Sequence, residues 1–258
     1  MKRSLPPATI IDTEVRDFPS RIMGINYQIS TWFPPEYPKP GYKYPVIYLT
    51  DAEVLLGQIA PMILYLFYGG MVPECLIVGL GHHISDLDDW AKARDIDYDP
   101  PENPMSETGQ KRADDFLLFL KQELIPFIET TYPADPADRC LAGFSSGGMF
   151  TLYALLHEPD LFLRYLIASA TFEIMMPHFL AYEEELAKKR TSLPVHAFLS
   201  AGELEEDIVP GLQQLVDQLH RRNYEGLRLN TLIDPGEGHF STGPTAFCKG
   251  FKAIYQPE

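Results

Sequence analysis

The feature that most constrains the fold of this chain is a serine between two glycines, in the stretch GFSSG at residues 143–147. The residues before it, 138–142, are typical of a turn and a short buried strand, and the apolar residues of 147–157 recur at the spacing of a helix. A serine on such a sharp strand-to-helix turn needs glycines beside it, because larger side chains would clash. The pattern predicts a nucleophile elbow with Ser145 at its tip; the alternative is an ordinary glycine-rich turn.

Strands and helices alternate along the rest of the chain, which predicts an α/β fold. An antiparallel hairpin is expected first, from two strands at 9–15 and 27–33. The next runs, at 45–49 and 75–80, are continuously apolar, as in strands that are buried on both faces of a parallel sheet. These two runs should therefore be central strands.

Three further apolar runs follow the elbow, at 165–168, 195–199 and 227–233, and bring the predicted number of strands to eight. The longest predicted helix covers 110–131 and contains Pro126, which should kink its last turn. We therefore predict one domain spanning all 258 residues, built on a mostly parallel eight-stranded sheet with helices on both faces. Ligands of such folds bind at the carboxyl ends of the strands.

The balance of charge argues against some classes of partner. The chain carries a formal net charge of −15 and has an isoelectric point near 4.8, whereas nucleic acids and anionic membrane surfaces attract proteins with a positive field. We therefore expect neither partner. No apolar run reaches the roughly 18 residues that span a bilayer, and the widely spaced Cys75, Cys140 and Cys248 are typical of reduced thiols in a cytoplasmic protein.

A serine hydroxyl needs a base to take its proton and a carboxylate to orient that base. His239 is the candidate base, because it lies in a glycine-rich loop after the last predicted strand; the other interpretation is a solvated loop histidine. The acid is expected after the strand that ends near residue 200. Four carboxylates lie there within five residues, and we choose Glu205, with Glu203, Glu206 and Asp207 left open as alternatives.

The oxyanion of an ester-cleavage intermediate needs two backbone N–H donors held in place. One is expected from Ser146, directly after the nucleophile, where the first turn of the helix has free N–H groups. The other is expected from the loop after the strand at 45–49, where we choose Glu53, with Ala52 as the alternative.

These motifs together resemble one known family, the putative-esterase branch of the α/β-hydrolases, which includes esterase D, feruloyl esterases, enterochelin-type esterases and mycolyltransferases. The resemblance covers most of the chain: an oxyanion strand at 44–51, a helix at 115–129, the elbow at 142–148, an acid loop at 202–205 and a histidine loop at 236–239. It implies an α/β-hydrolase fold and a serine esterase.

By this resemblance Ser145, Glu205 and His239 form the catalytic triad, and the backbone N–H groups of Glu53 and Ser146 form the oxyanion hole. The enzyme then needs no cofactor and acts on a small-molecule ester through an acyl-enzyme intermediate. Acyl transfer or thioester cleavage on the same triad, or a catalytically silent binding scaffold, are the alternatives.

The resemblance also makes Arg94 a candidate substrate contact near the entrance of the site. This chain departs from the family at two points. Ala52 stands where many members have glycine, which narrows the oxyanion loop, and the expected acid is glutamate, where aspartate is the commoner choice.

Two long segments, 81–110 and 171–192, are expected to shape the pocket as lids. The second carries Phe172, Met175 and Met176, which suit an adaptable apolar wall around an acyl or aryl group. The alternative is that these side chains pack against the core.

One cluster of polar residues has side chains of the types that bind metals. His82 and His83 are followed by several aspartates, but their spacing matches no strong ligand motif. A solvated acidic loop is the prediction for this segment, and no metal site is expected.

Overall fold

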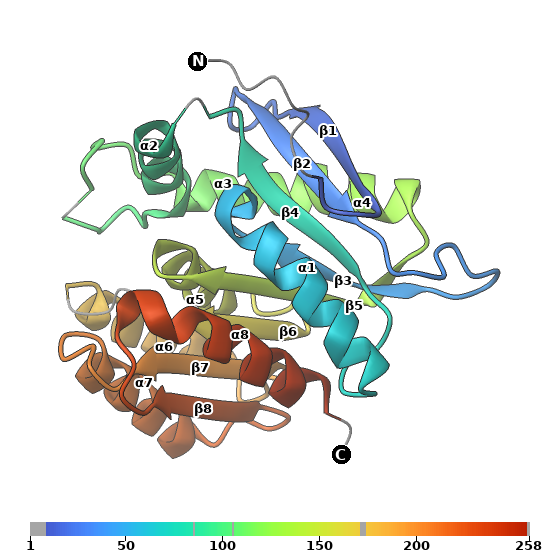
Figure 1. Ribbon diagram of the computed structural model, residues 1–258. Helices are drawn as coiled ribbons and strands as arrows, with labels where there is room; N and C mark the ends of the chain where they lie inside the picture. Colours follow the sequence, from blue (N-terminus) through green and yellow to red (C-terminus); the bar gives the residue numbers. More distant parts are fainter. Residues whose placement is uncertain (1–8, 85, 105, 171–173, 257–258) are drawn as a thin grey trace.

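The computed structural model describes residues 9–84, 86–104, 106–170 and 174–256. Through this part of the chain runs an eight-stranded sheet with the strand order β1-β2-β4-β3-β5-β6-β7-β8 (Figure 1). β1 and β2 form an antiparallel hairpin, β2 is antiparallel to β4, and every later pairing is parallel. The prediction of a mostly parallel sheet with an N-terminal hairpin is confirmed.

The strands are β1 (Thr13–Pro19), β2 (Asn26–Trp32), β3 (Tyr44–Leu49), β4 (Leu76–His82), β5 (Ala134–Phe144), β6 (Arg164–Ala168), β7 (His196–Gly202) and β8 (Arg228–Asp234). The helices are α1 (Ala52–Tyr68), α2 (Leu87–Tyr98), α3 (Ala113–Phe119), η1 (Leu120–Leu124), α4 (Ile125–Thr131), α5 (Ser146–His157), α6 (Met176–Lys189), α7 (Val209–Arg222) and α8 (His239–Tyr255).

The first strand lies four residues later than the sequence predicts. β1 pairs with β2 from Thr13 opposite Trp32 to Pro19 opposite Asn26. The prediction began too early because Ile10 is apolar. This side chain packs against the core cluster of α1, and its residue does not join the sheet. An edge strand that is largely exposed carries little apolar pattern of its own.

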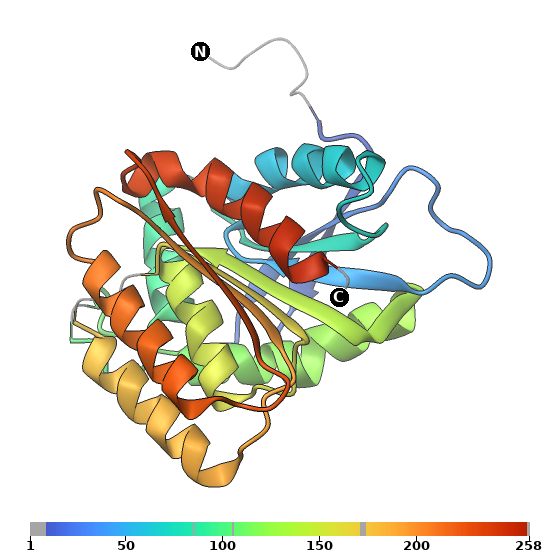
Figure 2. The same cartoon turned by 90° about the horizontal axis from the view of Figure 1, so that it is seen from below.

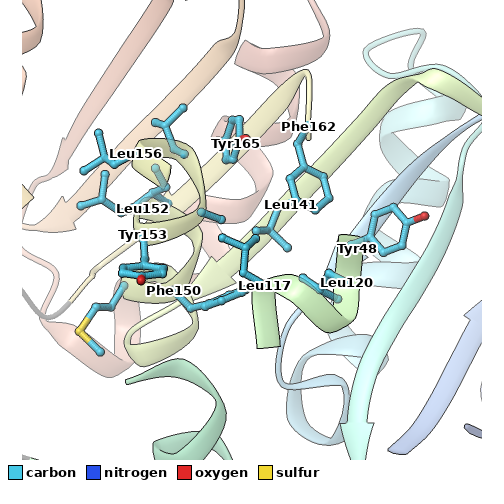
Figure 3. Packing of buried hydrophobic residues seen from close by; sticks show 14 of the residues in the cluster. Tyr48, Leu117, Leu120, Leu141, Phe150, Leu152, Tyr153, Leu156, Phe162 and Tyr165 are labelled. Atoms are coloured by element: carbon cyan, nitrogen blue, oxygen red, sulfur yellow. The ribbon is translucent and has the colours of Figure 1, made fainter. Parts of the chain in front are cut away.

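The helices lie in two layers, one on each face of the sheet (Figure 2). α1 and α8 cover one face, and α3 to α7 cover the other. Each face has its own buried apolar cluster. Figure 3 shows part of the larger cluster, in which side chains of α5, such as Phe150 and Leu152, meet Leu141 of β5 and Leu117 of α3. Packing on both faces explains the continuous apolar runs of the central strands.

The predicted helix at 110–131 is interrupted by a wide turn. In η1 the N–H of Ile125 bonds the carbonyl of Leu120, five residues earlier. Pro126, the second residue of α4, has no N–H, and its ring crowds the carbonyl of Gln122. The irregularity predicted at Pro126 is therefore present, but the chain absorbs it in the turn before the proline.

The parallel strands β3 to β8 end at one edge of the sheet, where the loops toward α1, α5, α6, α7 and α8 begin. α2 lies beyond the same edge (upper left in Figure 1) and packs against α3 and α5. Residues far apart in sequence thus meet at this edge. Within the described residues, no helix is both long and apolar enough to cross a membrane.

Candidate active site

The predicted elbow has the backbone that its glycines require. Ser145 joins β5 to α5 with φ 58° and ψ −122°, a backbone conformation that residues other than glycine rarely adopt. A Cβ at residue 143 would lie 2.1 Å from the carbonyl oxygen of Gly147, and a Cβ at residue 147 would lie 2.2 Å from Oγ1 of Thr50. Both glycines are therefore required by close contact, and the Ser145 hydroxyl is held at the tip of the turn.

The structure brings the three predicted side chains into one chain of hydrogen bonds. Oγ of Ser145 lies 3.0 Å from Nε2 of His239. Nδ1 of the same imidazole lies 2.5 Å from Oε1 of Glu205. The carboxylate therefore accepts the Nδ1 proton, which leaves Nε2 as the acceptor for the serine proton.

Among the four candidate acids, Glu205 is the one whose carboxylate lies against the imidazole. It is buried, with 3% of its surface exposed, whereas Glu206 and Asp207 are exposed. The carboxylate of Glu203 is turned elsewhere and accepts the N–H of Gly236 at 2.8 Å. Only one acid of the cluster thus faces the imidazole.

The second oxygen of the Glu205 carboxylate is also fully engaged. It accepts the N–H of Gly202 at 2.5 Å and the hydroxyl of Ser169 at 2.8 Å. Burial alone would raise the pKa of Glu205, but the hydrogen bonds from His239, Gly202 and Ser169 outweigh it and hold the pKa below its ordinary value. The acid is thereby kept ionised. No sequence pattern points to Ser169, which lies after β6 and meets this loop only in the folded chain.

His239 lies between two aromatic rings. The ring of Phe144, the residue before the nucleophile, is 4.9 Å from the imidazole centroid, and the ring of Phe240 is 5.1 Å from it. Phe240 stands almost free in solvent, with 94% of its surface exposed. An exposed apolar ring of this size beside the imidazole is unexpected, and no sequence pattern points to it.

The expected oxyanion donors both lie in the first turn of a helix. Ser146 is the first residue of α5 and Glu53 is the second residue of α1. N–H groups in the first turn have no carbonyl one turn earlier to bond, so they are available to a ligand. Asp51, the residue just before α1, is in the left-handed conformation with φ 54°, so the chain turns sharply between β3 and the helix.

The fold provides space for the methyl group of Ala52, which stands where many family members have glycine. A Cβ at residue 79 would lie 2.7 Å from the Cβ of Ala52, so Gly79 of β4 leaves the space that this methyl group fills. The side chain of Ala52 therefore packs on β4, on the inner side of the loop.

Helix α2 supports the oxyanion loop through one of its faces. Arg94 forms a two-pronged ion pair with Asp51, with distances of 2.9 Å from Nε to Oδ1 and 3.0 Å from Nη2 to Oδ2. The hydroxyl of Tyr98, four residues later, accepts the N–H of Asp51 at 3.2 Å. Arg94 also stacks on Trp90, 4.6 Å from the ring centroid. Its guanidinium is thus committed largely to the protein itself.

His82 does not lie in a solvated loop, so this part of the prediction is wrong. It ends β4 and is buried, with Nε2 2.8 Å from Oδ2 of Asp97 and Nδ1 3.3 Å from Oε1 of Glu53. His83, in contrast, is half exposed and faces Asp17 at 3.1 Å. The sequence pattern could not separate the two, because alternation along the strand sends one side chain inward and the next outward.

The expected apolar wall is only partly described. Phe172 lies outside the described residues. Met175 and Met176 are 2% and 6% exposed and belong to the same core cluster as Phe179. Their burial favours the alternative that they pack against the core. Of the two predicted lid segments, the second contributes α6, which packs against α5 and α7.

No group of three or more histidine, cysteine, aspartate or glutamate side chains suited to a metal ion occurs in the part of the chain that the structure describes.

The fold agrees with comparisons to known proteins. The sequence profile of the "Putative esterase" family matches residues 20–205. The chain belongs to this family. It is a carboxylic ester hydrolase with the α/β-hydrolase fold, and the resemblance drawn from its motifs is confirmed.

Individual known proteins match over nearly the whole chain. The ferri-bacillibactin esterase BesA of Bacillus subtilis (strain 168) is 29% identical over 269 residues, which cover 97% of this chain and 92% of that protein. Among solved structures, the BES protein from Bacillus cereus superposes with a TM-score of 0.87 at 27% identity and full coverage of both chains. The siderophore hydrolase EstB from Aspergillus nidulans shares the fold, with a TM-score of 0.85 at 16% identity and 98% coverage of both chains.

Proposed function

We propose that Ser145, His239 and Glu205 are the catalytic triad of this esterase. The observation that carries the proposal is the continuous set of hydrogen bonds from Oγ of Ser145 to Nε2 of His239, at 3.0 Å, and from Nδ1 of His239 to Glu205, at 2.5 Å. These distances are those required for proton transfer from a nucleophile to a base that a carboxylate orients.

The reaction runs in two steps on this triad. Oγ of Ser145 attacks the ester carbonyl while Nε2 of His239 takes the hydroxyl proton. The tetrahedral intermediate collapses, His239 gives that proton to the departing alcohol, and the acyl group stays on the serine. Water then attacks the acyl-enzyme with His239 as base again, which releases the carboxylic acid and restores the serine.

The negative oxygen of each tetrahedral intermediate is assigned to the N–H groups of Ser146 and Glu53. Their positions in the first turns of α5 and α1 support this role. The ion pair between Arg94 and Asp51 supports the loop that carries Glu53, and we assign Arg94 to the positioning of this loop.

We propose an ester bond within an iron-chelating siderophore as the substrate. The support comes from the relatives, since BesA is a ferri-bacillibactin esterase and EstB a siderophore hydrolase. Phe240, exposed beside the imidazole, supplies an apolar surface for such a ligand in place of the buried Met175 and Met176. Any iron(III) would enter as part of the substrate.

We also place the reaction in the cytoplasm. The thiols of Cys75 and Cys140 are buried and unpaired, a state that a reducing compartment maintains.

Two measurements test this function. A fluorophosphonate should add one mass increment to the wild-type protein and none to Ser145→Ala. Ferri-bacillibactin, free bacillibactin and a p-nitrophenyl ester should then be compared as substrates by mass spectrometry of the products. Labelling of Ser145 with no cleavage of either siderophore form would remove the proposed substrate and leave the esterase.

A further inference from the structure

A buried charge cluster lies directly behind one of the two proposed oxyanion donors. It consists of Glu53 from α1, His82 from the end of β4, Asp97 from α2 and Tyr27 from β2. His82 donates its backbone N–H to Oε1 of Glu53 at 2.5 Å. Its ring reaches both carboxylates, and the hydroxyl of Tyr27 donates to Asp97 at 2.7 Å. The mechanism described above uses none of these side chains.

The position of Glu53 poses an electrostatic problem. Its N–H is to stabilise a negative oxygen, yet its own side chain carries a carboxylate that is only 11% exposed. A second negative charge close to the oxyanion would oppose its formation, and poorly screened charges interact more strongly than those in water. Oε2 of Glu53 is buried and has no hydrogen-bond partner among the described residues. The charge on Glu53 therefore needs a counter-charge from within the protein.

His82 can supply that charge only in its protonated form. Both ring nitrogens face a carboxylate oxygen, Nδ1 that of Glu53 and Nε2 that of Asp97. Carboxylates only accept hydrogen bonds, so both nitrogens must carry a proton and the ring is an imidazolium. Burial lowers the pKa of His82, but the bonds to Asp97 and Glu53 outweigh it and raise the pKa to about 9.

We propose that His82 is a positioning residue for ester hydrolysis: its imidazolium neutralises the Glu53 carboxylate and fixes the first turn of α1, so that the Glu53 N–H can hold the oxyanion. This inference rests on the proposed function, because it takes Glu53 as one of the two oxyanion donors. His82 touches no substrate in this role and acts through Glu53.

The other charged groups around the cluster are already paired. Asp51, next to Glu53, is held by Arg94, and the phenol of Tyr27 remains protonated because burial, then Asp97, raises its pKa. Tyr98 is likewise protonated, chiefly through burial. Loss of the His82 proton therefore leaves two carboxylates uncompensated behind the oxyanion loop. On the alkaline side of its pH profile, activity should therefore decline as the pH rises through about 9.

The first test compares His82→Gln with the matched control His83→Gln, whose side chain is half exposed on the neighbouring position. With p-nitrophenyl butyrate at pH 7.5, kcat of His82→Gln should fall roughly 10- to 100-fold with little change in KM, since loss of one oxyanion donor outright costs about 10²- to 10³-fold. His83→Gln should stay within about twofold of wild type, the range of a surface change that removes no buried contact. Equal kcat values for the two variants would overturn the proposal.

A second change separates charge from structure. Replacement of Glu53 by glutamine in the His82→Gln background removes the uncompensated carboxylate, so most of the lost kcat should return. A purely structural role for His82 predicts no such recovery, and its absence in a folded double variant would refute the electrostatic role.

The pH profile supplies a third readout that does not depend on the folding of His82→Gln. Asp97→Asn removes one of the two carboxylates that hold the proton, so the alkaline decline of kcat should move from about pH 9 in wild type toward lower pH. An unchanged profile would contradict the proposal. Ser145→Ala measures spontaneous hydrolysis and tests the triad separately from the role of His82. Activity in Ser145→Ala refutes the triad. An inactive Ser145→Ala together with a normal His82→Gln refutes the role of His82 alone.

Discussion

Two histidines lie on opposite sides of the elbow strand β5 in the sheet. His82 ends β4, and His239 follows β8. Each has a carboxylate on one ring nitrogen, Asp97 at 2.8 Å for His82 and Glu205 at 2.5 Å for His239. They differ in the partner of the other nitrogen. For His239 it is the neutral hydroxyl of Ser145, and for His82 it is a second carboxylate.

This second partner decides what each imidazole can do. A neutral hydroxyl leaves the His239 nitrogen free to accept a proton and return it, as a general base requires. Two carboxylates instead retain the proton on His82 through neutral pH, so this ring serves as a fixed cation. A histidine beside a carboxylate is therefore not by itself a sign of a catalytic base.

The largest loss of activity is expected when the serine or the proposed base, His239, is removed. Ser145→Ala or His239→Gln should lower kcat/KM on the order of 10⁵-fold, because triad members act as one unit. The measurement is initial-rate kinetics on a p-nitrophenyl ester, with circular dichroism as the control for folding. Losses of the same size in His239→Gln and His82→Gln would erase the distinction between the two rings.

Removal of the orienting carboxylate should have the next largest effect. We expect Glu205→Gln to lower kcat about 10³- to 10⁴-fold, since the amide favours the wrong imidazole tautomer. Glu203→Gln, two residues earlier in the same loop, is the matched control and should keep kcat within about twofold, as expected of an exposed position. A strong loss in the Glu203 variant would reassign the acid.

The fixed charge on His82 should also make stability depend on pH. Its pKa is raised from 6.5 to about 9 in the folded protein, so its contribution is complete below pH 6.5 and is lost as the pH rises through 9. The free energy of unfolding should fall by up to about 3 kcal/mol over this window. Urea unfolding between pH 6 and 10 measures this, and the decline should be smaller in His82→Gln by that amount, since the rest comes from groups such as the thiols of Cys75 and Cys140, whose pKa burial also raises. An equal decline in both proteins would rule out His82 as its source.

The smallest expected effect concerns the side of His239 that faces solvent. Phe240→Ala should raise KM about three- to tenfold for esters of aromatic acids and leave acetyl esters within about twofold, given the energy of one aromatic contact. Tyr65→Ala, which removes another largely exposed ring, on α1, is the control. A uniform change across the ester series would assign Phe240 to the stability of the loop.

Much of the fold could be predicted from the sequence, because the pattern there is local. The continuous apolar runs at 45–49 and 75–80 predicted buried parallel strands, and β3 and β4 are wholly buried. Glycines 143 and 147 predicted the elbow, since close packing at these positions forbids a side chain. The bounds predicted for β1 were wrong because an exposed edge strand has little apolar pattern.

The three residues of the proposed triad differ in the strength of their local sequence signal. Ser145 and His239 each have a local signal, a glycine-flanked turn and a loop after the last strand. The choice of Glu205 among four neighbouring acids had no such signal, because the contacts that distinguish it come from Ser169 and His239, 36 and 34 residues away in sequence.

The sequence by itself determined that this chain builds a parallel sheet with a serine elbow, because periodicity and glycine placement act over a few residues. Only the tertiary structure decided the surroundings of His82 and Met175. His82, predicted in a solvated loop, is buried between two carboxylates, and Met175, predicted in a pocket wall, packs in the core. Charge and burial depend on partners brought together from separate strands and helices, and no local pattern records those partners.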